Sequence, residues 1–101
     1  MLAVLMMVTA LDADWSESEL RARIKASPPE VAAYASRRIG CNYWLGERDY
    51  ATIPERQAQV QQALKPLHCE NIDRDERRLQ RKYRFNEQLI RLLRQLHDFV
   101  P

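Results

Sequence analysis

The stretch SPPEVAAYASRRIGC, residues 27–41, contains a helix start and one of the two cysteines in this 101-residue chain. Ser27 is a favoured N-cap residue, and Pro28 stands where a missing amide hydrogen costs nothing. Glu30 can reach back to the cap from the third helical position. These residues predict that a helix begins at about residue 28.

The end of this helix is expected near the first cysteine, Cys41. Apolar residues recur at helical spacing as far as Ile39, which predicts a helix from about residue 28 to residue 40. An extension to Leu45 is the alternative, with Gly46 as the C-terminal stop.

Two more helix starts flank this stretch. The capping box from Ser16 to Glu19 predicts a first helix over about 17–26. Downstream, the sequence TIPE at residues 52–55 predicts a third helix, which Pro66 should stop or kink because proline disfavours helical geometry in the preceding residue. The segment after Pro66 is expected to be a connector.

The C-terminal region reads as two more helices, because Asn86 can cap a new helix after a break near Phe85. We expect them over about 73–84 and 87–98. No stretch alternates with the period of a β-strand. The predicted fold class is therefore all-α, a small bundle of four to five short helices with one disulfide, in a single helical domain over residues 14–101.

The N-terminal run MLAVLMMVTAL, residues 1–11, contains no charged side chain. It is too short to span a bilayer, which needs roughly 20 apolar residues, but it has the length of a secretory h-region. We interpret residues 1–13 as a signal peptide cleaved after Ala10 or Ala13. The alternative is an uncleaved apolar segment packed as a core helix.

Cys41 and Cys69 are predicted to form a disulfide, since cysteines of exported proteins tend to pair. With this bond, residues 42–53 would have to run back along the third helix rather than form a tight hairpin. Two alternatives remain open. One is a nucleophilic cysteine beside His68, and the other is a zinc site that adds His68 and His97 to the two cysteines, although adjacent His68 and Cys69 do not match the usual ligand spacing.

The string CNYWLGE, residues 41–47, places two aromatic residues, an amide and an acid beside the first cysteine. Asn42, Tyr43, Trp44 and Glu47 are candidate partner-binding residues, because exposed tyrosine and tryptophan dominate interface hot spots. Asn42, Trp44 and Glu47 could also form a polar pocket. The competing interpretation is that Trp44 fills the core beside the disulfide.

A basic stripe lies in the predicted helix at residues 73–84, with its members three or four residues apart. It consists of Arg74, Arg77, Arg78, Arg81, Lys82 and Arg84. Arg74, Arg77, Arg78 and Arg81 are further candidate partner-binding residues. Nearby acids dilute the stripe, however, and the net charge of +2 is too small to imply a polyanion partner.

No dinucleotide-binding loop, P-loop, zinc-protease motif or nucleophile elbow is present, and the sequence indicates no cofactor. We therefore expect a non-catalytic protein that is periplasmic or secreted and binds another protein, as an inhibitor, immunity factor or accessory factor does. One alternative is a cytoplasmic nucleic-acid-binding protein that uses the stripe at 74–84. The other is a small enzyme with a pocket around Cys41, Trp44 and Glu47.

Overall fold

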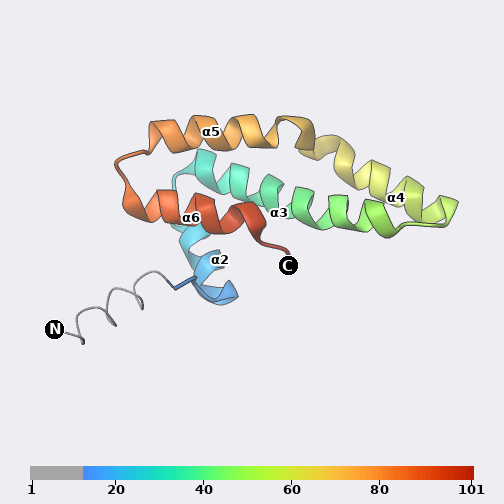
Figure 1. Ribbon diagram of the computed structural model, residues 1–101, viewed down its shortest axis with the longest axis horizontal. Coiled ribbons are helices and arrows are strands. Elements are labelled where there is room, and N and C mark those ends of the chain that lie inside the picture. The colour runs from blue at the N-terminus through green and yellow to red at the C-terminus, as the bar shows by residue number, and fades with distance from the viewer. Residues whose placement is uncertain (1–12) are drawn as a thin grey trace.

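The computed structural model describes residues 13–101, and within this range the chain is all helical with one disulfide, as the sequence predicted. Five α-helices are joined by short turns and two 3-10 helices (Figure 1). The elements are α2 (Glu17–Lys25), α3 (Pro29–Tyr50), α4 (Pro54–Leu64), η1 (Lys65–Leu67), η2 (Cys69–Asn71), α5 (Ile72–Lys82) and α6 (Glu87–Asp98). The predicted signal segment, residues 1–13, lies outside the described residues except for its last residue.

Helix α3 is the centre of the bundle and contacts each of the other four α-helices. After α3 the chain turns back through α4 and the two 3-10 helices into α5, so that this whole segment runs antiparallel to α3 (Figure 1). Helix α6 lies beside α3 and α5, and α2 packs against α3 and α6. No helix among the described residues is long and apolar enough to cross a membrane.

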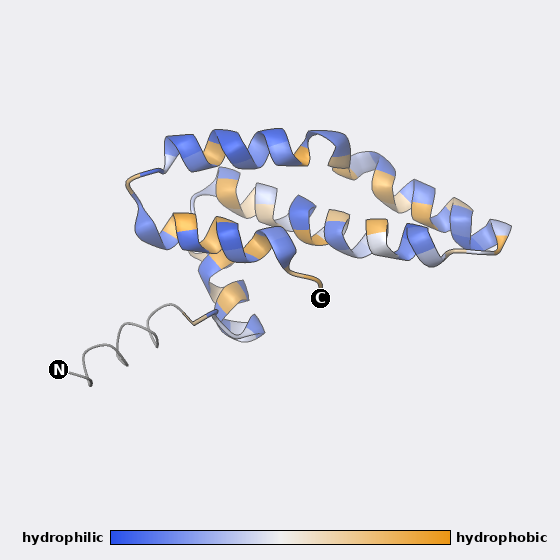
Figure 2. Cartoon of the chain, in the orientation of Figure 1, coloured by the Kyte–Doolittle hydropathy of each residue, from blue (hydrophilic) through white to orange (hydrophobic). Residues whose placement is uncertain are grey.

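The hydrophobic core lies where α2, α3, α5 and α6 meet. Its fully enclosed side chains include Leu20, Val31, Leu79, Leu93 and Leu96. These residues form narrow apolar stripes on otherwise hydrophilic helices, most clearly on α5 (Figure 2). Burial of such stripes is the main driving force for bundle formation. Helix α4 adds only Val60 to the buried residues.

Helix α3 is longer than predicted, and the prediction that Gly46 stops it is wrong. The helix continues through Gly46 to Tyr50, and the loop from Ala51 to Ile53 connects it to α4. The end of α3 packs along α4, so these residues do run along the third helix as expected. The turn between the two helices spans only residues 51–53, however, so the expectation that there is no tight hairpin is wrong. A glycine inside a helix costs only about 1 kcal/mol, which contacts between α3 and α4 outweigh.

The predicted N-cap residue is present at two helices but not at a third, and at α2 only the Ser16 half of the predicted capping box forms. The Ser16 hydroxyl accepts from the Glu19 amide at 3.3 Å, and the Asn86 side chain accepts from the Leu89 amide at 3.1 Å. Ser27, by contrast, does not cap α3, because its hydroxyl donates to the Ile24 carbonyl at 2.6 Å. Glu30 does not reach back to the cap either, because it binds side chains of α5 instead.

The connector after α4 packs closely on α3. Helix α4 ends at Leu64, just before the predicted break at Pro66, and two 3-10 turns follow. A Cβ atom on Gly40 would lie 3.0 Å from the Leu67 Cδ1 atom. Glycine at this position in α3 therefore leaves room for the connector that carries Cys69.

Candidate binding surface on the α3–α4 arm

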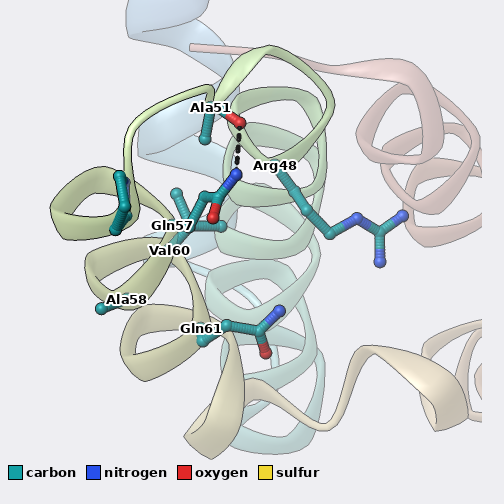
Figure 3. Close-up of a pocket in the computed structure, with 7 residues that line it drawn as sticks. Arg48, Ala51, Gln57, Ala58, Val60 and Gln61 are labelled. Atoms are coloured by element: carbon teal, nitrogen blue, oxygen red, sulfur yellow. Dashed lines mark hydrogen bonds between the residues drawn. The ribbon is translucent and has the colours of Figure 1, made fainter.

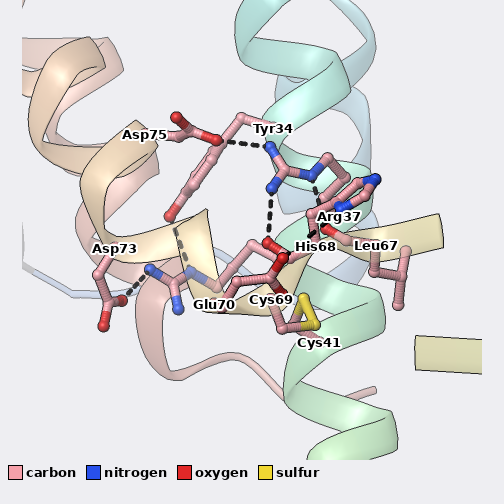
Figure 4. The surroundings of a disulfide bond; sticks show 10 residues. Tyr34, Arg37, Cys41, Leu67, His68, Cys69, Glu70, Asp73 and Asp75 are labelled. Atoms are coloured by element: carbon pink, nitrogen blue, oxygen red, sulfur yellow. Dashed lines mark hydrogen bonds and ion pairs between the residues drawn. A yellow bond between two sulfur atoms is a disulfide. The ribbon is translucent and has the colours of Figure 1, made fainter. Parts of the chain in front are cut away.

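The disulfide joins the middle of α3 to the first residue of η2 (Figure 4). Cys41 is fully buried, and the Cα atoms of Cys41 and Cys69 are 5.7 Å apart. Because the sulfurs are bonded to each other, neither is available as a nucleophile or a zinc ligand. His68 lies beside Glu70 and His97 beside Glu76, so the predicted four-residue zinc set does not assemble.

Arg37 fixes the connector next to this disulfide. Its guanidinium donates to the Leu67 carbonyl at 2.9 Å, to the His68 carbonyl at 3.1 Å and to the Asp75 carboxylate at 2.8 Å (Figure 4). His68 has a φ of 49°, in the left-handed region. The Arg37 hydrogen bond also lowers the pKa of Asp75. Sequence analysis did not identify Arg37.

Arg38 occupies a buried polar network between α3 and α5. It donates to the Tyr34 hydroxyl at 2.8 Å, to Asp73 at 2.8 Å and to Glu76 at 3.2 Å. Burial raises the pKa of Tyr34 to about 12. Loss of one partner from such a network leaves an uncompensated buried charge, so the network fixes the register of α5 on α3.

Three side chains of this region lie close enough together to hold a metal ion. Ligand atoms of Asp73, Glu76 and His97 all lie within 4.8 Å of one another. The Arg38 guanidinium, however, already donates hydrogen bonds to both carboxylates. It supplies the positive charge that a cation would bring, so this arrangement is explained as a structural network.

Asn42 was predicted to bind a partner or to line a pocket with Trp44 and Glu47. In the structure its side-chain amide donates to the carbonyls of Leu96, His97 and Phe99 at 3.2, 3.2 and 2.7 Å. Asn42 therefore satisfies the C-terminal end of α6, while Glu47 turns toward α4. The three side chains do not converge on one pocket.

The second half of α3 and the first half of α4 extend beyond α5 and α6 at one end of the molecule (Figure 1). We call residues 43–59 the α3–α4 arm. None of these residues is fully buried, and none belongs to the hydrophobic core. The arm is therefore a protrusion whose side chains are not required to fill the interior.

A cluster around Arg56 joins the two helices of the arm. The Arg56 guanidinium donates to Glu47 at 2.8 Å and lies 5.3 Å from the centre of the Trp44 ring. The Tyr43 and Trp44 rings pack edge to face at 4.9 Å between centroids. The hydrogen bond to Glu47 raises the pKa of Arg56. Trp44 is thus partly buried against Arg56, and the prediction that it fills the core is wrong.

The tip of the arm exposes two large apolar side chains that sequence analysis missed. Tyr50 is 85% exposed and Ile53 is 57% exposed. An open pocket of about 470 Å³ lies beside the tip, between α3 and α4. Two of its lining residues are joined by a hydrogen bond, which the Gln57 side-chain amide donates to the Ala51 carbonyl at 3.2 Å (Figure 3). The lining residues are Arg48, Ala51, Pro54, Gln57, Ala58, Val60 and Gln61.

The remaining predicted residues lie on α5, away from the arm. Arg74, Arg77, Arg78 and Arg81 are all exposed on this helix. The structure therefore brings Tyr43, Trp44 and Glu47 together, but it places the arginines on a separate surface.

Comparison with known proteins gives no further guidance, since no protein-family model, curated protein or solved structure matches the chain.

Proposed function

We propose that this protein is an exported, non-catalytic factor that binds another protein through the α3–α4 arm. Inhibitors, immunity factors and accessory factors are classes of protein that act by binding another protein. The observation that carries the proposal is the exposed apolar tip, Tyr50 and Ile53, on a protrusion that contributes nothing to the core. Exposed large apolar side chains on the same part of a surface are typical of interaction sites.

The arm is held rigid, which favours binding. The Arg56–Glu47 ion pair links α3 to α4, and the disulfide ties the connector after α4 to α3. A contact surface that is already ordered loses little conformational entropy when it binds. A convex protrusion of this kind fits a concave and largely apolar site on the partner.

Export is supported by the disulfide together with the uncharged N-terminal run. Disulfides persist in oxidising compartments and are rare in the cytosol. Intact-mass measurement on native material should detect a chain that begins after Ala10 or Ala13. Recovery of the chain with Met1 from the cytosol would contradict export.

The arm is tested by site-specific photocrosslinking in cells that produce the protein. A photoreactive residue at position 50 should capture a partner, and the same residue at position 94 on α6 should not. The captured partner is then purified and titrated with the wild-type protein and with the double variant Tyr50→Ala/Ile53→Ala. We expect an affinity loss of about thirtyfold or more, as for hot-spot anchors.

Both replaced side chains are largely exposed, so this variant should unfold at the same temperature as the wild-type protein. Arg94→Ala is the matched control and should bind normally. Unchanged affinity in the double variant would remove the arm from the interface. Trp44→Ala is less decisive, because its partly buried ring also packs on Arg56 and its loss would affect both stability and binding.

A further inference from the structure

The outward face of α5 carries a row of arginines, most of which form no ion pair among the described residues. At 100° per residue, Arg74, Arg77 and Arg81 fall within about 60° of arc. This arc is opposite the side of α5 that buries Ile72 and Leu79. Arg84 follows in the turn after the helix. We call Arg74, Arg77, Arg81 and Arg84 the α5 arginine face.

The acids of α5 are close in sequence to this face, and each of them is paired with an arginine of α3. Asp75 pairs with Arg37 at 2.8 Å, while Asp73 and Glu76 pair with Arg38 at 2.8 and 3.2 Å. All three thus bind arginines of α3, although the Asp73 side chain remains 65% exposed. The dilution of the basic stripe that the sequence suggested is therefore reduced on the outer surface, where it persists at Arg74, beside Asp75, and at Arg77, whose charge acts on Asp73.

The other two basic residues of α5 differ from those of the face, because they are already paired with an acid. Arg78 and Lys82 both bind Glu30 of α3. Among residues 13–101, the acid nearest to the face is Asp75, which lies 3.5 Å from Arg74. Arg77, Arg81 and Arg84 form no ion pair within this range. Their charges are available to a partner.

An exposed aromatic ring lies at the end of the arginine face. Phe85 is 87% exposed in the turn between α5 and α6, and the Arg84 guanidinium lies 4.7 Å from the ring centre. A hydrogen bond from the Asn86 amide to the Tyr83 carbonyl, 2.8 Å long, closes this turn. The fold thus presents a large apolar side chain directly beside a row of cations.

We propose that the α5 arginine face and Phe85 form a docking surface for anionic lipid headgroups. The charges are complementary to lipid phosphates, and basic residues near an anionic membrane strengthen binding individually. An aromatic side chain next to basic residues is typical of segments that lie in the membrane interface. The disulfide favours an oxidising compartment, where a membrane surface is a more accessible polyanion than nucleic acid.

The proposal is tested by co-sedimentation with vesicles of phosphatidylcholine, with and without phosphatidylglycerol. The full chain should bind the anionic vesicles more tightly, and high salt should reduce this preference. Arg77→Glu/Arg81→Glu should lose about thirtyfold or more of the affinity for anionic vesicles. Lys25→Glu/Lys65→Glu changes the net charge equally at exposed positions outside the face and should bind nearly normally.

The wild-type protein and all variants contain the apolar residues 1–11. Any affinity of this segment for lipid is therefore the same in each protein and does not affect the difference between them. If the double glutamate variant loses helix content by circular dichroism, Arg77→Gln/Arg81→Gln replaces it. Phe85→Ala should weaken vesicle binding but leave binding to soluble heparin unchanged. Equal binding of the two charge-reversed variants would overturn the proposal. Salt-sensitive binding of duplex DNA without a preference for anionic vesicles would also overturn it, in favour of nucleic acid.

Discussion

Arg37 and Arg38 are neighbours in the sequence, yet they perform separate tasks on α3. Arg37 holds the carbonyls of the connector, and Arg38 enters the buried network with Tyr34 and Glu76. Together they engage all the acids in the first two turns of α5. The pairing explains why acids that resemble a helix-dipole cluster in the sequence bind arginines of α3 in the fold.

Glu30 makes the third connection between α3 and α5. Lys82 and Tyr83 donate hydrogen bonds to its carboxylate, and Arg78 lies nearby. The hydrogen bond from Lys82 is the largest cause, followed by that from Tyr83, of a pKa that falls from 4.5 to about 2. The charged form of Glu30 is therefore stabilised by the folded state.

This lowered pKa predicts a pH dependence of stability. Between pH 4.5 and about pH 2 the unfolded chain binds the Glu30 proton more readily than the folded chain. The stabilisation is therefore complete above pH 4.5 and lost as the pH falls toward 2. Urea unfolding at a series of pH values in this range measures the free energy of unfolding. This free energy should fall more steeply with decreasing pH for the wild-type protein than for Glu30→Gln.

Glu19→Gln is the matched control, because Glu19 is exposed and forms no ion pair among residues 13–101. It should follow the wild-type pH dependence. Parallel curves for the wild-type protein and Glu30→Gln would show that the contact with α5 does not form in solution.

At the scale of elements, the length of α3 determines the most exposed feature of the molecule. A helix that stopped at residue 40 or Leu45 would leave no arm. Continuation to Tyr50 places the turn to α4, with Ile53, far from the core. The chain tolerates Gly46 inside this helix although glycine is a poor helix former.

Gly46→Ala should therefore stabilise the protein by up to about 1 kcal/mol. A Cβ atom at this position meets no atom within 4 Å beyond the nearby backbone of its own helix, so no steric cost is expected. The gain comes from the higher helix propensity of alanine and from the lower conformational entropy of the unfolded chain. Urea unfolding measures the difference.

Gly40→Ala is the control within the same helix. Its Cβ atom would lie 3.0 Å from the Leu67 Cδ1 atom and 3.3 Å from Cδ2, so the connector would have to move. It should gain less stability than Gly46→Ala or lose some. Destabilisation by Gly46→Ala would argue that α3 is interrupted at this glycine.

For the whole molecule, the disulfide is the covalent link between the core and the base of the arm. Cys41 and Cys69 are 28 residues apart, and the bond closes the loop that contains the whole arm. In the chain-entropy model, such a loop stabilises the fold by about 3.6 kcal/mol. A small core has little stability in reserve, so this contribution is a large share of the total.

Replacement of both cysteines, Cys41→Ala with Cys69→Ala, should lower the free energy of unfolding by about 2 to 5 kcal/mol. The helix content at low temperature should change little, because the caps and apolar stripes are local. Thermal unfolding followed by circular dichroism gives both quantities. Two free thiols in native protein, or a double variant as stable as the wild type, would contradict this prediction.

The sequence alone was enough for features that depend on near neighbours. Ser16, Asn86 and Pro66 act on amides and backbone angles within a few residues, so they correctly placed helix starts and breaks. The paired cysteines correctly indicated the disulfide.

Only the tertiary structure decided the length of α3, the protrusion of the arm and the direction of each charged side chain. Arg38 and Glu76 are 38 residues apart, and Asn42 lies 57 residues from the carbonyl of Phe99. Contacts over such separations arise when helices pack, and helix propensity contains no information about them. For this reason the sequence suggested that acids dilute the stripe of α5, whereas packing pairs these acids with Arg37 and Arg38 of α3 and leaves the arginines of α5 on the surface.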